Sequence, residues 1–583
     1  MLNQLSLIKR PIFFMRYAFL FMALYSFNAI AAPDASEVLK QQQDLERFNN
    51  LPQAIPVAPK VETPLEESSK AVKVYVQSFK IVGDLKAVSE KTLQALILDL
   101  TDKELTFEQI QSAADRINQY YAGEGYFLAK AIIPKQELLD GVVIIQVNEG
   151  KLDSKKPYKI NGQKLRLKES RVYSYIDQAI GSGLSQPLLE RGLLNINDNP
   201  GVSATAAIEP GDDIGSSRVL LDVAEGPLLD GSVTADNFGS RLTGADRLTA
   251  ALNLNNPTSY GDQLSVNAIT APGRVFNMAK IGYGVPIGSS GLRAGISYTY
   301  LYFELGEELK TDPASLGVAR NWNLNLRYPL YRNALSAVYL TGTYDWKSSY
   351  NEAAGIMSGD KRVDVFGGNV TVEHADSFMG GGFSQIQVGL VRGRLDLSNY
   401  AQGLFDDQSV TGPKTNGDYD KATFQLLRIQ RGTERLSFQF LGNAQISDKN
   451  LDGGEKITLG GPTGVRAYPG GEGSGDQGYK FNLDSKYVIA SATKLGDIVG
   501  SLFLDYGWVQ QNKDATNIVM TTPNTYSLAG WGVGVDAVSA GKFTLKLGWA
   551  KAIGNNPGLS AQGTNSDGKA NMSRFWLMGN VSF

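Results

Sequence analysis

Strict alternation of apolar and polar residues fills the chain from about residue 228 to its last residue. The segments 248–255, 292–302 and 322–330 each place apolar side chains at every second position. A period of two predicts strands with one apolar and one polar face. About sixteen such segments follow one another, roughly one per 22 residues, which is typical of a transmembrane β-barrel. We therefore predict a membrane β-barrel of about sixteen antiparallel strands over residues 228–583.

Upstream of this region, one pattern occurs twice. The segment 142–150 (VVIIQVNEG) resembles 218–226 (RVLLDVAEG). In the first unit, 72–81 alternates, and two helical stripes follow; Thr106 and Gln109 form a capping box at the start of the second helix. In the second unit, the helices are expected at 172–180 and 188–196. The pattern predicts two small α+β modules of order β-α-α-β-β, at 71–152 and 153–227.

The first 70 residues divide into three further parts. Basic residues precede an apolar run at 17–25 and small residues that end at Ala32, so 1–31 is predicted to be a secretory signal peptide. The run is shorter than the roughly 20 residues that a spanning helix needs. Residues 32–50 are polar and favour a short helix, and prolines predict an extended linker at 51–70.

Composition argues against several classes of function. The chain has no cysteine, so we expect neither disulfides nor cysteine metal clusters. Its one histidine, His374, lies in a strand segment and is interpreted as a lumen or loop residue. Little material remains for hydrolytic triads or zinc sites, and a net charge of −3 gives no case for nucleic acid. We predict no enzymatic activity, no metal and no cofactor.

A long connection at 448–479 separates the eleventh and twelfth strand segments, and it is expected on the extracellular side. It carries Arg466 within a glycine-rich stretch. In the strand 497–510, alternation turns Asp505 toward the lumen, opposite Leu502 and Leu504. An arginine from the loop would reach this carboxylate in a partly wet lumen and form a charge-assisted pair with it.

These segments resemble two-partner secretion transporters of the outer membrane, the TpsB family of haemolysin, filamentous haemagglutinin and contact-dependent inhibition transporters. The resemblance covers the whole chain after the signal peptide. The loop sequence is similar to the family's Val-Arg-Gly-Tyr/Phe motif at the tip of a loop that folds back into the pore, and the strand matches Phe-x-Asp-x-Gly. The residues concerned are Val465, Arg466, Ala467 and Tyr468 in the loop and Phe503, Asp505 and Gly507 in the strand.

Ala467 stands where many members of the family carry glycine. If the position requires a positive φ, alanine would strain it by about 1–2 kcal/mol. The resemblance also implies that 71–152 and 153–227 are polypeptide-transport-associated (POTRA) modules. The helix at 32–50 is implied to be a removable pore plug, and a mere polar leader remains the alternative.

The resemblance implies a transporter in the outer membrane of a Gram-negative cell, with both modules in the periplasm. Its partners would be membrane lipid and one large exoprotein, unfolded in transit; an adhesin, a haemolysin, a haem-binding protein or a contact-dependent toxin all fit. The terminal Phe583 resembles the signal that the barrel assembly machinery recognises. The alternatives are an assembly factor for other barrels, a passive porin-like barrel and, third, a barrel enzyme.

Overall fold

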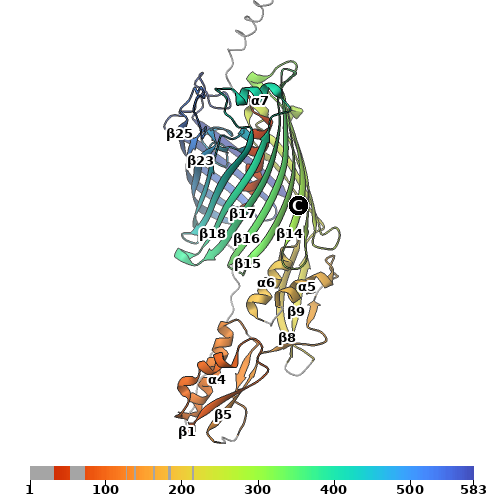
Figure 1. Ribbon diagram of the computed structural model, residues 1–583, viewed down its shortest axis with the longest axis vertical. Coiled ribbons are helices and arrows are strands. Elements are labelled where there is room, and N and C mark those ends of the chain that lie inside the picture. The colour runs from red at the N-terminus through yellow and green to blue at the C-terminus, as the bar shows by residue number, and fades with distance from the viewer. Residues whose placement is uncertain are drawn as a thin grey trace, which may run out of the picture.

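The computed structural model describes residues 32–52 and 73–583, except 127, 137–139, 162–163, 181–184 and 213–215. The predicted signal peptide and most of the predicted linker lie outside these residues. A closed barrel stands above two small α/β modules (Figure 1). Among the described helices, none is long and apolar enough to cross a membrane.

The barrel confirms the predicted number and direction of strands. Sixteen strands close in chain order, each antiparallel to its neighbours. They are β10 (Leu229–Asp236), β11 (Arg247–Asn255), β12 (Gln263–Thr270), β13 (Phe276–Pro286), β14 (Arg293–Glu304), β15 (Leu316–Arg332), β16 (Ser336–Ala353), β17 (Ile356–Asp376), β18 (Gly382–Asp396), β19 (Gly417–Arg431), β20 (Leu436–Ser447), β23 (Gln477–Thr493), β24 (Gly496–Gln510), β25 (Thr525–Ser539), β26 (Phe543–Ile553) and β27 (Ser573–Ser582).

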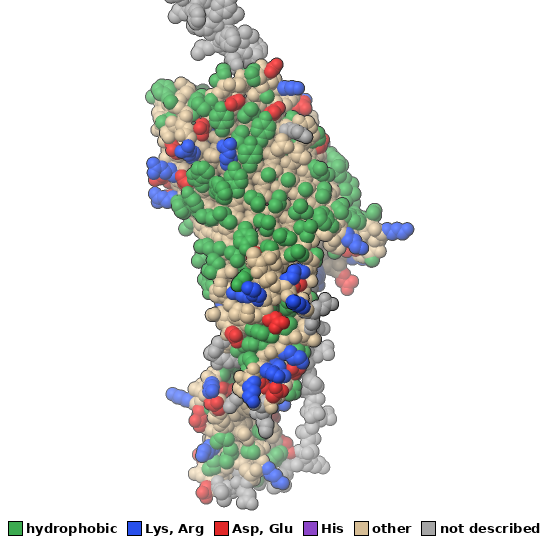
Figure 2. Space-filling model, turned by 90° about the vertical axis from the view of Figure 1, so that its right-hand side faces the viewer, with side chains coloured by type: hydrophobic (Ala, Val, Ile, Leu, Met, Phe, Trp, Pro, Cys, Tyr) green, Lys and Arg blue, Asp and Glu red, His purple; other side chains and the backbone are tan. Residues whose placement is uncertain are grey.

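The alternation in sequence separates the outer surface of the barrel from its lumen. Leu248, Trp322 and Leu502 are exposed on the outside, whereas Asn323 and Asp505 face inward. Figure 2 shows hydrophobic side chains spread over the barrel wall, with charged side chains gathered above it and over the modules below. An apolar outer face is what a barrel in lipid requires, because hydrocarbon cannot solvate polar groups.

One sequence interpretation about orientation is wrong. His374 lies near the end of β17, in phase with the exposed Val370 and Val372, so it faces outward and not into the lumen. Its Nδ1 lies 2.8 Å from Ser336 Oγ on the neighbouring strand. Alternation alone would have given this direction, because Val372 and His374 are two residues apart.

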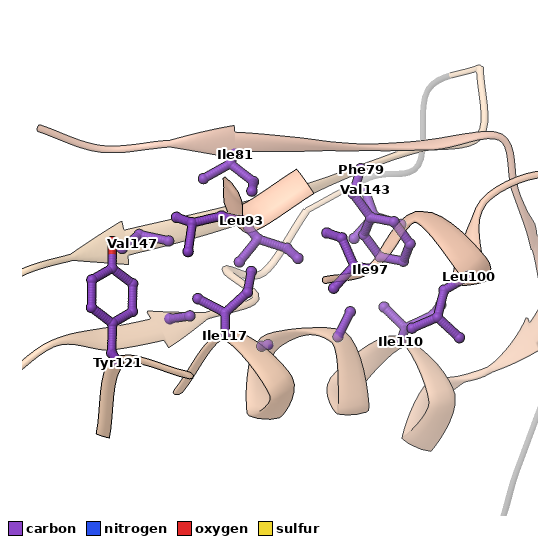
Figure 3. Close-up of a cluster of buried hydrophobic side chains, with 14 of the residues drawn as sticks. Phe79, Ile81, Leu93, Ile97, Leu100, Ile110, Ile117, Tyr121, Val143 and Val147 are labelled. Atoms are coloured by element: carbon purple, nitrogen blue, oxygen red, sulfur yellow. The ribbon is translucent and has the colours of Figure 1, made fainter. Parts of the chain in front are cut away.

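The first module is an α/β unit with more strands than predicted. Its chain order is β1 (Lys73–Val76), β2 (Ser78–Val82), α3 (Glu90–Ala95), β3 (Lys103–Thr106), α4 (Phe107–Gly123), β4 (Lys130–Ile132) and β5 (Val142–Asn148). β1 and β3 pair as a separate small sheet, while β2, β5 and β4 form the main one. The predicted capping box at Thr106 is present. In Figure 3, Leu93 of α3 and Ile117 of α4 point toward Ile81 and Val143 on the sheet, and Ile97, after the end of α3, joins the same core.

The second module repeats this plan against the barrel. Its chain order is β6 (Lys151–Leu152), β7 (Tyr158–Asn161), α5 (Glu169–Ile180), α6 (Gln186–Asn197), β8 (Val202–Pro210) and β9 (Ser216–Glu225). Polar contacts tie it to turns at one end of the barrel, which we call the module end. They are Asp198 with Arg332, Arg171 with the carbonyl of Gly288, and Glu225 with Asn256.

A glutamate closes each repeat in the same way. Glu149 accepts hydrogen bonds from three backbone N–H groups of the loop after β2, and Glu225 accepts two from the loop after β7. Burial by itself would raise the pKa of Glu149, but these donors and the Tyr121 hydroxyl outweigh it and hold that pKa below its usual value. The Glu-Gly that is repeated in the sequence therefore marks the place where the end of the last strand is hydrogen-bonded to an earlier loop of the same module.

Candidate functional site

Two segments occupy the lumen: the loop between β20 and β23, residues 448–476, and the N-terminal helix. The re-entrant loop carries a 3₁₀ turn at Gly453–Glu455 and a short pair of strands, β21 (Ile457–Thr458) and β22 (Ser474–Gly475). Glycine shapes its tip: Gly461 has φ +111°, and a Cβ on Gly464 would lie 2.0 Å from the Leu459 carbonyl oxygen. A glycine-rich segment can therefore turn back sharply inside the barrel.

Arg466 at the loop tip binds two carboxylates on the barrel wall. Its Nε and Nη2 donate to Asp505 at 3.0 and 2.7 Å, and its backbone N–H donates to Asp505 at 2.9 Å. Its Nη1 and Nη2 reach both oxygens of Asp484 on β23, at 2.8 and 3.2 Å. We call Arg466, Asp484 and Asp505 the Arg466 cluster. The planar guanidinium suits this double engagement, because it presents its donors in a fixed fork.

The Arg466 cluster is drier than the sequence predicted. Asp505 is completely buried, and the side chain of Arg466 is only 17% exposed. The guanidinium also lies over the ring of Phe503, 3.6 Å from its centroid. Asn482 donates to Asp505 at 2.8 Å and to the carbonyl of Gly464 at 2.6 Å. The expectation of a partly wet setting is therefore wrong at this position, although lumen space remains elsewhere.

Sequence reasoning brought Arg466 and Asp505 together but missed Asp484 and Asn482. Alternation in β23 turns both inward, because the exposed Tyr479 and Leu483 define the outer face. That signal was available in the sequence. The family resemblance does not mark these two residues, because its motifs lie only in the loop and in β24.

The other motif residues pack as a small core at the loop tip. Val465, Ala467 and Tyr468 are completely buried, with Leu459 and Phe503, against the inner wall. Ala467 is not among the described residues with positive φ, so the strain considered from the sequence does not arise. A Cβ on Gly530 of β25 would lie 2.8 Å from the Ala467 methyl group; glycine on the strand thus accommodates alanine in the loop. Gly507 likewise faces Leu459 of the loop.

The helix α2 (Ala35–Asn49) begins at the end of the lumen far from the modules, the distal end. Asp34 caps it by accepting from the N–H of Ser36 at 2.8 Å. Lys361 of β17 joins this cap to the re-entrant loop: its Nζ lies 2.8 Å from Asp34 and 2.6 Å from Asp452. Gly454 permits the close approach, because a Cβ there would lie 2.7 Å from Ser36 Cβ. The helix and the loop therefore share one cation.

The rest of α2 follows the lumen toward the modules (Figure 1). Val38 and Leu39 pack on Phe276 and Phe303 of the inner wall. Further along, Glu46 pairs with Lys280 at 2.7 Å. A polar cavity of about 670 Å³ remains beside the helix, lined by residues such as Asn323 and Gln385. The lumen is thus occupied by α2 and the loop on one side and retains space on the other.

The described residues offer little for chemistry or metal binding. Within them, no group of three or more His, Cys, Asp or Glu side chains is arranged to hold a metal ion. Several buried charges of the lumen form ion pairs, as Lys421 and Lys347 do with Glu455 of the loop, at 2.8 and 2.7 Å. These polar contacts can hold α2 and the re-entrant loop in place inside the barrel.

The chain is similar to known proteins over most of its length. The model of the family described as "Haemolysin secretion/activation protein ShlB/FhaC/HecB" matches residues 215–537, and the "POTRA domain, ShlB-type" matches residues 74–150. The heme/hemopexin transporter protein HuxB of Haemophilus influenzae (strain 86-028NP) is 25% identical over 480 residues, 80% of this chain and 81% of that protein.

Other similarities agree with the family match. The outer membrane transporter CdiB of Escherichia coli O6:K15:H31 (strain 536 / UPEC) is 24% identical, over 85% of this chain and 84% of that protein. The solved structure of CdiB from Escherichia coli superimposes with a TM-score of 0.75 at 20% identity, covering 95% of this chain and 100% of that one; it shares the fold. Because the family model matches more than half of its residues, the chain belongs to the ShlB/FhaC/HecB family of haemolysin secretion/activation proteins.

Proposed function

We propose that this protein moves one large exoprotein from the periplasm to the cell surface through the barrel lumen, by two-partner secretion. The single observation that carries the proposal is the occupied lumen. A re-entrant loop and a helix lie inside it, and both are held by polar side-chain contacts that can break. A passive porin has no need of such occupants. HuxB and CdiB, which are similar over most of the chain, are named as transporters.

In this account, the modules face the periplasm and the distal end faces the cell surface. The outward apolar face contacts outer-membrane lipid. The first module receives the unfolded exoprotein, which adds a strand to an exposed sheet edge; β2 and β4 are the two edges of its main sheet. α2 and the re-entrant loop then shift to open the path. No step requires a catalytic residue, so the protein acts as a transporter and not as an enzyme.

Deleting residues 73–149 tests the receptor role of the first module. The module has its own core, whereas the contacts of Arg171 and Asp198 with the barrel turns come from the second module. We expect a folded, heat-modifiable barrel, because the strand pairing of the barrel is complete without the module. Secretion of a co-expressed exoprotein partner should fall to background. It would be measured as exoprotein in the culture medium.

Two variants separate the sheet edge from the rest of the module, one at the edge and one as a control. Asn118→Ala removes the hydrogen bonds between α4 and Ala131 of β4 and should reduce secretion only in part. Arg116→Ala is the control: it breaks an exposed ion pair with Asp99 and should leave secretion unchanged. Normal secretion from the deletion variant would contradict the receptor role.

A further inference from the structure

The first and last strands of the barrel meet along a short seam. β10 pairs with β27 over 232–236 against 578–582, whereas β16 pairs with β17 along its whole length. At the module-side end of the seam, Gly231 and Phe583 add two backbone hydrogen bonds of 3.0 Å. Toward the distal end, the regular pairing stops at Asp236. The distal part of the seam must therefore be held in another way.

Asn237 continues the pairing with its side chain. Its Oδ1 accepts from the N–H of Leu577 at 2.8 Å, and its Nδ2 donates to the carbonyl of Phe575 at 2.9 Å. Its backbone N–H donates to the Leu577 carbonyl at 3.2 Å. A side-chain amide has a donor and an acceptor, as a peptide group has. One asparagine thus replaces two positions of the ladder.

Trp576 lies between the two residues that Asn237 contacts, and it faces the lumen. It is 8% exposed. Its indole Nε1 donates to the backbone carbonyl of Arg466 at 2.8 Å. Its ring meets Phe238, the residue after Asn237, edge to face, with centroids 5.8 Å apart and planes at 78°. One side chain therefore touches the loop tip and both sides of the seam.

We propose that Trp576 is a positioning residue that makes closure of the distal seam depend on the position of the re-entrant loop. When Arg466 is in the cluster, its carbonyl accepts the indole proton and fixes the ring. When the loop tip leaves, a buried indole N–H loses its acceptor, which is unfavourable. The ring then moves. As a result, the hydrogen bonds of Asn237 to the residues on either side of Trp576 weaken, together with the contact between Phe238 and the ring.

The variant Trp576→Phe tests this coupling because it keeps a ring and removes the donor. Hydrogen–deuterium exchange of the purified full-length protein would be followed by mass spectrometry. We expect the amides of β27 at 573–582 to exchange about 2- to 10-fold faster, as for the loss of one buried hydrogen bond. Amides of β16 and β17 should be unchanged. Trp508→Phe is the matched control: it alters a ring of β24 that stacks on Tyr479 of β23, away from β27, β16 and β17, and should change neither region.

Two further variants show whether the loop acts through Trp576. Arg466→Ala should accelerate the same amides, and adding Trp576→Phe to it should bring no further acceleration. A short bifunctional thiol reagent across Ala235→Cys and Gly579→Cys, which are register partners in a chain without native cysteine, should cancel the acceleration.

Unchanged exchange in Trp576→Phe, equal acceleration in every strand, or additive effects with Arg466→Ala would overturn the proposal. The measurement uses no exoprotein, so its failure would leave the proposed transport function standing.

Discussion

Replacing Arg466 by alanine should release the re-entrant loop and abolish secretion while the barrel stays folded. The change leaves Asp505, which is completely buried, and Asp484, which is 13% exposed, facing each other without a cation. Removing one partner of a buried ion pair costs about 3–5 kcal/mol, which corresponds to a rise of more than about a hundredfold in the released loop population. The strand ladder does not involve Arg466, so heat-modifiability should persist. Cleavage within 448–476 by proteinase K would report loop release.

The two carboxylates predict a particular order among variants. Asp505→Ala should be milder than Arg466→Ala, because Asp484 still binds the guanidinium. The double variant Arg466→Ala/Asp505→Ala should be no worse than Arg466→Ala, since it removes one of the uncompensated charges. Arg466→Lys should rescue only in part, because an ammonium group lacks the planar fork. Arg394→Ala, at an exposed arginine of β18, is the matched control. Additive defects in the double variant would mean that Arg466 and Asp505 act independently.

Replacing Lys361 by methionine should loosen α2 from the lumen. Lys361 joins the helix cap Asp34 to Asp452 of the loop, and the two carboxylates are 23% and 8% exposed. Because the pair is only partly buried, we expect a loss of about 1–3 kcal/mol, below the cost of a fully buried pair. The fraction of time with α2 outside the lumen should therefore rise by about 5- to 150-fold. Single-channel recordings in planar bilayers would show it as more frequent wide openings.

Two variants serve as references for the channel recordings of Lys361→Met. Deletion of Ala35–Asn49 should give openings that persist, which sets the conductance of the helix-free state. Lys494→Met, in the exposed turn after β23, removes a lysine far from α2 and should behave as the unmodified protein. Lys361→Met openings no more frequent than those of Lys494→Met would show that α2 is held by other contacts.

Much of the barrel could be predicted because lipid imposes a simple pattern on the sequence. Leu248 and Trp322 must face hydrocarbon, so period two fixed the strand count and the direction of Asp505. The modules were harder. Short strands such as β1 and β3 have little hydrophobic pattern, and they are defined by their pairing with each other. The first of the two predicted helices is also shorter than its stripe of apolar residues suggests: α3 ends at Ala95, and a separate 3₁₀ turn follows at Leu98–Leu100.

The polar contacts inside the lumen were largely beyond sequence reasoning. Arg466 and Asp505 could be paired because each lies in a recognisable motif. Lys361, Asp34 and Asp452 lie far apart in the chain, and their meeting depends on where the helix and the loop sit inside the closed barrel. Alternation states that a side chain faces inward but not which segment it meets there. Alternation predicts that Trp576 faces inward. Its hydrogen-bond acceptor, however, is the backbone carbonyl of Arg466, which no sequence pattern identifies.

Crosslinking of an exoprotein in transit tests the central claim most directly. Asn323 lines the polar cavity beside α2, and the next residue, Leu324, faces outward and is 47% exposed. The chain has no native cysteine, so Asn323→Cys and Leu324→Cys each carry a single thiol. An exoprotein with one cysteine, stalled by a folded domain at its C-terminus, would be co-expressed with each. Passage through the lumen predicts a disulfide-linked complex with Asn323→Cys and none with Leu324→Cys. Secretion that continues with crosslinks only at Leu324→Cys, or at neither position, would contradict the account.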